Sequence, residues 1–204
     1  MKSTRVRVIL AAVAAGAALT ACSPAQAGAV AIVGGERISA GELDAGVKEF
    51  EAARARTGGD TSGLRGSVPQ AVLSNLISIE QVGQLSERNG VTVTESEIDG
   101  FLAQYRSQAG QQVTDEQIAV SVGAPPSKLR DLVRITLAEQ KLLQRFGAGQ
   151  DDASRQAASQ KLAKEAETIK IVRNPRYGVV NPQAQSGADY YVDAGRFGRL
   201  QAAS

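Results

Sequence analysis

The residues that carry most enzyme chemistry are scarce in this 204-residue chain, which has no histidine and a single cysteine, Cys22. The absence of histidine excludes the commonest general base, the Ser–His and Cys–His nucleophile pairs, and most metal sites. Cys22 is the only thiol nucleophile, and it has no second cysteine for an internal disulfide. The chemistry of this thiol therefore depends on the sequence around it.

The chain opens with a segment that has the composition of an export signal. Lys2, Arg5 and Arg7 make its start basic, and residues 8–18 are an unbroken apolar run. That run is shorter than the roughly 20 residues that a membrane-spanning helix needs. We therefore expect residues 1–21 to be a cleaved signal peptide.

The four residues that end at Cys22, Leu-Thr-Ala-Cys, resemble the bacterial lipobox. The resemblance implies transfer of diacylglycerol to the Cys22 sulfur, cleavage before Cys22 and acylation of the new amine. The two or three acyl chains of a lipoprotein hold a protein stably on a membrane. We expect an anchor at the extracytoplasmic face of the cell membrane, with residues 22–28 as a tether. The alternative is an ordinary signal peptide cut after Ala27, where Ala-Gln-Ala also has the cleavage form.

The net charge of the chain is +2, and three of its basic residues belong to the leader. Without the leader the charge is 2 − 3 = −1. A nearly neutral chain offers no global electrostatic case for nucleic acid as a partner.

Two acidic motifs resemble cation sites but lack the residues to complete them. Residues 95–100, Glu-Ser-Glu-Ile-Asp-Gly, copy the opening of a calcium loop, but the twelfth position is Arg106, which has no carboxylate. Asp151 and Asp152 form a carboxylate pair without an acid–base partner nearby in the sequence. Helix N-termini favour acidic residues, which explains both motifs. We therefore expect neither a metal site nor a cofactor.

Apolar spacing and capping residues predict a mostly α-helical domain over residues 29–178, with five or six helices. Residues 29–33 and 36–38 are β-prone, and Gly34 and Gly35 between them suit a two-residue hairpin turn. Three of the helices are expected to begin in an S/T-x-x-E/Q capping box. The expected helices begin at Ser39, Ser67, Thr94, Thr114, Ser127 and Ala153 and end near Arg56, Asn89, Gly110, Val122, Phe146 and Ala166.

A further β-prone run, residues 168–172, lies at the other end of the domain and precedes a turn at residues 174–178. Each β run alone would leave an unpaired edge, so we expect the N- and C-terminal strands to pair. Residues 179–204 show no periodicity, and we expect them to form a disordered tail.

This order of elements resembles the N-terminal chaperone domain of the SurA and PrsA family, which is related in form to the peptide-binding part of trigger factor. Residues 31–38, Ala-Ile-Val-Gly-Gly-Glu-Arg-Ile, are similar to the family's opening strand A-x-V-N-G-x-x-I, with Gly34 where asparagine is usual. Residues 114–130 are similar to its short helix, break and long helix, and residues 169–178 to the closing strand and turn of actinobacterial lipoproteins of this kind. The resemblance covers residues 29–178. It implies ATP-independent binding of unfolded or partly folded exported polypeptides.

The chain departs from the family pattern at one point. Family members often carry a parvulin prolyl-isomerase domain between the long helix and the final helix, whereas here that gap is only residues 147–154. The parvulin site also relies on histidine, so the resemblance carries over no isomerase activity and no catalytic residue. We predict a chaperone-like binder that is not an enzyme. A lipoprotein that assembles with one dedicated partner is the alternative.

Four aromatic residues of the expected helices, Phe50, Phe101, Tyr105 and Phe146, are candidates for contact with a client polypeptide. Binding surfaces expose apolar side chains among polar ones, which is the basis of this hypothesis. Their helical spacing also suits a packed core, and this is the interpretation that we favour.

Four basic residues, Arg130, Arg134, Lys141 and Arg145, fall near one face of the longest expected helix. Such a face suits either anionic lipid or solvent, and we favour solvent.

Overall fold

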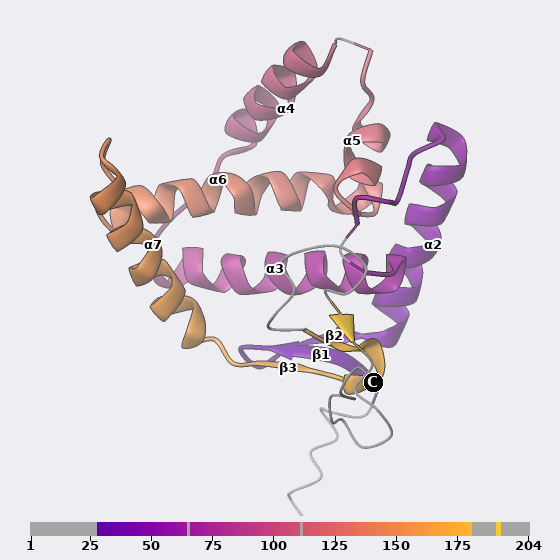
Figure 1. Ribbon diagram of the computed structural model, residues 1–204, viewed down its shortest axis with the longest axis horizontal. Coiled ribbons are helices and arrows are strands. Elements are labelled where there is room, and N and C mark those ends of the chain that lie inside the picture. Colours follow the sequence, from indigo (N-terminus) through magenta and orange to yellow (C-terminus); the bar gives the residue numbers. More distant parts are fainter. Residues whose placement is uncertain (1–27, 65, 111, 181–190, 193–204) are drawn as a thin grey trace, which may run out of the picture.

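The computed structural model describes residues 28–64, 66–110, 112–180 and 191–192 (Figure 1). Within these ranges the helices and strands are β1 (Ala29–Val33), β2 (Glu36–Ser39), α2 (Ala40–Thr57), α3 (Val68–Arg88), α4 (Glu95–Ala109), α5 (Asp115–Ser121), α6 (Leu129–Arg145), α7 (Asp152–Glu167), β3 (Ile171–Arg173), β4 (Val179–Val180) and β5 (Tyr191–Val192). The mostly α-helical class predicted from the sequence is confirmed. The predicted signal peptide, Cys22 and the tether up to residue 27 lie outside the described residues.

The strand β1 lies at the centre of a three-stranded antiparallel sheet with the order β2-β1-β3. Gly34 and Gly35 form the turn between β1 and β2 at φ angles of 58° and 102°, a region that favours glycine. On the other edge of β1, Ile32 lies opposite Val172 of β3. The predicted pairing of the N- and C-terminal strands is confirmed.

The C-terminal strand begins three residues later than its β-prone run suggests. The helix α7 continues to Glu167, and Thr168 forms its C-cap. Ile169 is then inserted into the core, where 2% of its surface is exposed. Pairing with the hairpin begins at Lys170, whose carbonyl accepts a hydrogen bond of 2.9 Å from the Gly34 amide. A buried apolar side chain, rather than local β-propensity, therefore decides where this strand starts.

The helices α3 and α6 lie side by side in the middle of the domain, with α2 and α7 at their two ends (Figure 1). The sheet lies on the α3 side, whereas α4 and α5 lie beyond α6. The main core joins the sheet to α2, α3 and the C-terminal half of α6. Its largest fully buried side chains include Phe50, Leu43, Leu73, Leu85, Leu142, Ile169, Val30 and Val33.

The hairpin turn is fixed to α3 by a close approach at Gly34. The Gln84 side chain of α3 donates a hydrogen bond of 2.8 Å from Nε2 to the Val33 carbonyl. A Cβ at position 34 would lie 1.9 Å from Gln84 Oε1, so the end of the Gln84 side chain would have to move and its bond to Val33 would be disturbed. Glycine is therefore favoured here by its φ angle and by the close approach of Gln84.

Side-chain caps begin most helices, as the sequence predicts, with two corrections. Thr94 with Glu97 and Thr114 with Gln117 form complete capping boxes. Ser39 accepts a hydrogen bond from the Glu42 amide, which is the first half of a box only. The prediction that Ser127 caps the long helix is wrong, because a 3-10 turn (Pro126–Lys128) precedes α6. The Ser127 amide and hydroxyl instead donate to the Glu49 carboxylate of α2 at 2.7 and 2.6 Å.

The region predicted to be a disordered tail contains the strands β4 and β5, which pair antiparallel with Val179 opposite Val192. Residues 181–190 and 193–204 lie outside the described residues, so disorder stays a prediction for them. Among the helices that the structure describes, none has both the length and the apolar character needed to cross a membrane.

Replacing Phe50 by alanine should strongly destabilise the domain, because its side chain is fully buried in the main core. We expect Phe50→Ala to lower the free energy of unfolding by about 3–5 kcal/mol. The half-exposed Tyr105 provides the control, and Tyr105→Ala should cost less than about 1 kcal/mol. Urea unfolding of the mature chain measures both. Equal losses for the two variants would contradict the assignment of Phe50 to the core.

Candidate functional site

The helix α4 packs against α6 through a small apolar cluster that is separate from the main core. Ile98 and Leu102 of α4 are buried in it, together with Leu129 and Val133 of α6 and Ile118 of α5. This cluster attaches α4 to α6, whereas α5 also contacts α2 and contributes Val120 to the main core. The α4–α5 arm, formed by these two helices, projects from the side of α6 that faces away from the sheet (Figure 1).

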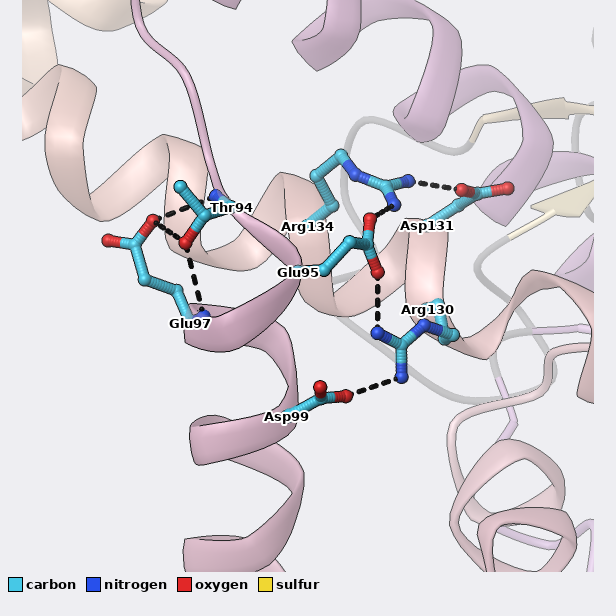
Figure 2. Close-up of polar contacts among 7 residues, drawn as sticks. All are labelled: Thr94, Glu95, Glu97, Asp99, Arg130, Asp131 and Arg134. Carbon is cyan, nitrogen blue, oxygen red and sulfur yellow. Dashed lines mark hydrogen bonds and ion pairs between the residues drawn. The ribbon is translucent and has the colours of Figure 1, made fainter.

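Ion pairs across the first turn of α4 reinforce this attachment, as Figure 2 shows. The Glu95 carboxylate lies between two guanidinium groups of α6, 2.5 Å from Arg130 Nη2 and 2.7 Å from Arg134 Nη2. Asp99, one turn further along α4, lies 2.8 Å from Arg130 Nη1. Arg134 also contacts Asp131 of its own helix, at 2.5 Å. These hydrogen bonds from arginine lower the pKa of the Glu95 carboxyl.

A third carboxylate of α4, Glu97, is bound from two sides. It lies 2.6 Å from Lys141 Nζ of α6 and accepts hydrogen bonds from the Thr94 amide and hydroxyl at 2.8 and 3.0 Å. The Lys141 ammonium, followed by the Thr94 donors, lowers the pKa of Glu97 from 4.5 to about 2. Lys141 also donates to the Thr92 carbonyl at 2.7 Å, so it fixes the segment that leads into α4.

These contacts explain the two charged motifs that stand out in the sequence. The acidic residues of the calcium-like motif are paired with cations of α6. The basic face of α6 does not simply face solvent, because Arg130, Arg134 and Lys141 all pair with α4, while Arg145 is exposed. In the part of the chain that the structure describes, no group of three or more Asp, Glu, His or Cys side chains is arranged to hold a metal ion.

A groove of about 450 Å³ lies between α4 and α6, next to the ion pairs. Phe101 and Leu137 are half-buried in it, and Tyr105 is 38% exposed. The remaining lining residues are polar: Glu97, Gln104, Gln108 and Gln140. The groove therefore combines an apolar surface with three side-chain amides.

The groove chemistry suits a polypeptide backbone more than a charged ligand. A glutamine amide both donates and accepts hydrogen bonds, so it can pair with an N–H or with a C=O. Each residue of a chain that is not folded has one unpaired donor and one unpaired acceptor of this kind. The carboxylate of Glu97 is already occupied by Lys141 and Thr94. The groove thus offers apolar contact and adaptable polar contact without a fixed charge pattern.

The four aromatic candidates lie in different places. Phe101 and Tyr105, one turn apart on α4, line the same groove. Phe50 has no exposed surface and supports the main core, and Phe146 is partly buried against that core. Cys22, the predicted lipidation site, lies outside the described residues.

Sequence reasoning missed the polar and α6 residues of the groove. Gln104 and Gln108 follow Phe101 and Tyr105 at intervals of three residues on α4, so their spacing could have placed them on the same face. Leu137 and Gln140 carried no such signal, because nothing in the sequence shows that α6 packs beside α4.

Comparison with protein families matches residues 1–107 to the SurA-like N-terminal domain, slightly more than half of the chain. The chain belongs to the SurA-like N-terminal domain family. The matched part of this SurA-like chain includes β1, β2, α2, α3 and most of α4. The family is one of chaperone-type rather than catalytic domains, and no parvulin match accompanies it. No curated protein and no solved structure shows a significant match to the chain.

Acid should loosen the α4–α6 contact through Glu97. Because its pKa is lower in the folded chain than in the unfolded chain, the stability that it contributes is complete above about pH 4.5 and is lost as the pH falls towards 2. We expect Glu97→Gln to flatten the fall in the free energy of unfolding over this range.

The matched control is Glu165→Gln, an exposed glutamate of α7 that forms no ion pair with the described residues. Urea unfolding at a series of pH values compares the variants. If Glu97→Gln and Glu165→Gln show the same pH dependence, the pairing with Lys141 does not hold α4 in place.

Proposed function

We propose that this protein is a lipid-anchored, ATP-independent chaperone-like lipoprotein that binds unfolded or partly folded exported polypeptides in the α4–α6 groove. The observation that carries the proposal is the groove lined by Phe101, Tyr105 and Leu137 together with three glutamines. Membership of a chaperone-type family supports the same role.

The form of the groove supports transient binding. Its volume, about 450 Å³, is at the lower end of the roughly 300–1,000 Å³ typical of ligand pockets, which suits a few side chains of a client at a time. Burying one or two apolar side chains contributes only about 1.5–3 kcal/mol each before the costs of association. Such contacts are weak and exchange quickly, as a binder that releases clients without ATP requires.

The ion pairs support this function by positioning one wall of the groove. Glu95 and Asp99 hold α4 at a defined place on α6, and the side of α4 from Glu97 to Gln108 lines the groove. Exposed ion pairs contribute little to stability, so these pairs orient the arm more than they stabilise the domain. A client thus meets a preformed groove.

The groove assignment is tested by an aggregation assay on a chemically unfolded client diluted into buffer. The mature chain should suppress light scattering at a near-stoichiometric ratio with two unrelated clients. We expect Tyr105→Asp to raise the concentration needed for half suppression by roughly five- to tenfold, as expected for about 1–1.4 kcal/mol of lost contact. Val122→Asp is the matched control, since Val122 is exposed and lies outside the groove.

No suppression at a large excess of the mature chain would overturn the general chaperone role. A narrow, specific set of partners crosslinked on intact cells would then favour a dedicated assembly protein. Equal effects of Tyr105→Asp and Val122→Asp would leave the chaperone role in place but remove the groove from it.

The lipid anchor is tested at Cys22. We expect the intact protein to incorporate radiolabelled palmitate and to sediment with membranes, and Cys22→Ser to abolish both. Mass spectrometry of the mature N-terminus distinguishes the alternatives. An unmodified chain that begins at Gly28 would show that an ordinary signal peptidase cuts after Ala27, and it would contradict the anchor.

A further inference from the structure

One surface of the domain lies within short reach of the proposed lipid. Five residues lie between Cys22 and Gly28, the first described residue, so the six steps of an extended chain at roughly 3.3–3.6 Å each span at most about 22 Å. Gly28 precedes β1, and the sheet therefore lies closest to the lipid. The α4–α5 arm lies at the opposite end of the molecule (Figure 1).

The edge strand of this sheet exposes apolar side chains between basic ones. Ile171 and Val172 of β3 are 38% and 40% exposed, and they are two of only four large apolar side chains so exposed in the described residues. Lys170 and Arg176 flank them and are exposed, while Arg173 is half-buried.

The strand register continues this surface across the sheet. Val172 and Arg37 both lie opposite Ile32, on its two sides, so the three residues form one row on one face. A hollow of about 240 Å³ on this side is lined by Ile32, Val172 and Pro175, among others. Arg37 lies beside the tether, since a Cβ on Gly28 would lie 3.0 Å from its Nη2 atom.

Positive charge is concentrated in the C-terminal part of this surface even though the chain without its leader has a net charge of −1. Residues 22–35 and 168–188 contain no aspartate or glutamate, while the second range carries Lys170, Arg173 and Arg176. Glu36, Glu167 and Asp189 are the acidic residues that border these ranges. Arg130, Arg134 and Lys141 of α6 lie beside α4 and are paired with its carboxylates.

We propose that Ile32, Arg37 and residues 170–176 form a membrane-contacting surface, here named the sheet surface, that rests on anionic lipid headgroups beside the anchor. Basic side chains interspersed with apolar ones are what binding at a lipid interface uses. The acyl chains supply the anchor, and the sheet surface sets the orientation. The α4–α6 groove then points away from the membrane, towards polypeptides that have emerged from it. This inference rests on the lipid anchor proposed above.

Vesicle binding tests the sheet surface without the lipid anchor. The full mature chain with Cys22→Ser should bind vesicles rich in phosphatidylglycerol and not vesicles of phosphatidylcholine alone. Each basic residue near an anionic surface raises the affinity by about fivefold. The double variant Lys170→Gln with Arg176→Gln should therefore weaken vesicle binding by about 25-fold. The control pair, Lys48→Gln with Arg145→Gln, removes the same charge from exposed positions on α2 and α6 and should change binding by less than about fivefold.

An equal loss of binding in the two double variants, or no binding to anionic vesicles, would overturn the sheet surface. Either result would leave the anchor and the groove untouched, because neither takes part in this measurement. Thermal unfolding of both double variants ensures that a loss of fold is not read as a loss of binding.

The orientation is tested on the lipidated protein. Since Cys22 is the only cysteine, a fluorophore can be placed alone at Val172→Cys or at Gln104→Cys. In anionic vesicles, headgroup-attached quenchers should quench the probe at 172 and spare the probe at 104. Quenching of 104 in preference to 172 would contradict the proposal, and so would equal quenching of both.

Discussion

The pairing of β1 with β3 is the constraint on which the rest of the structure depends. It joins Ile32 to Val172, and every described α-helix lies in the chain between them. Closing so long a loop costs entropy, although this cost grows only slowly with length. Burial of Val30 and Val33 in the main core and the hydrogen bond from the Asn174 amide to the Val30 carbonyl offset it. The sheet in turn is held on α3 by the contact between Gln84 and the glycine turn. Packing of α3, α6 and α7 thus rests on a strand contributed by each end of the domain.

The α4–α5 arm is held in place by a different combination of contacts. Its apolar contact with α6 is a small cluster, and the ion pairs of Glu95, Glu97 and Asp99 surround that cluster on exposed surface. Neither the apolar cluster nor the ion pairs would hold the arm firmly alone, since exposed pairs are weak and the cluster is small. Together they define an angle between the two helices, and the groove with Phe101 and Tyr105 is the space left at that angle. The candidate binding site therefore depends on the small α4–α6 cluster and on the ion pairs around it. It lies apart from the main core.

Local signals in the sequence were sufficient for most of the fold. Capping residues such as Thr94 and Thr114 mark helix starts through bonds three residues away, and two adjacent glycines mark the hairpin. The predictions fail where a contact with a residue distant in sequence outweighs the local signal. Ser127 bonds to Glu49 of α2 instead of capping its own helix, and burial of Ile169 delays the last strand. The groove is likewise predictable only in part. Helical spacing places its α4 residues on one face, whereas Leu137 and Gln140 join them only through tertiary packing.

The short link between α6 and α7 is a point at which the fold can accept an inserted module. It consists of residues 146–151. The two helices are packed against each other, so the two ends of this link are already close in space. Because the closing strand is held by β1 and not by the link, a whole catalytic module can be gained or lost there without unravelling the scaffold. The closed sheet thus makes the fold a host that tolerates insertion at this link.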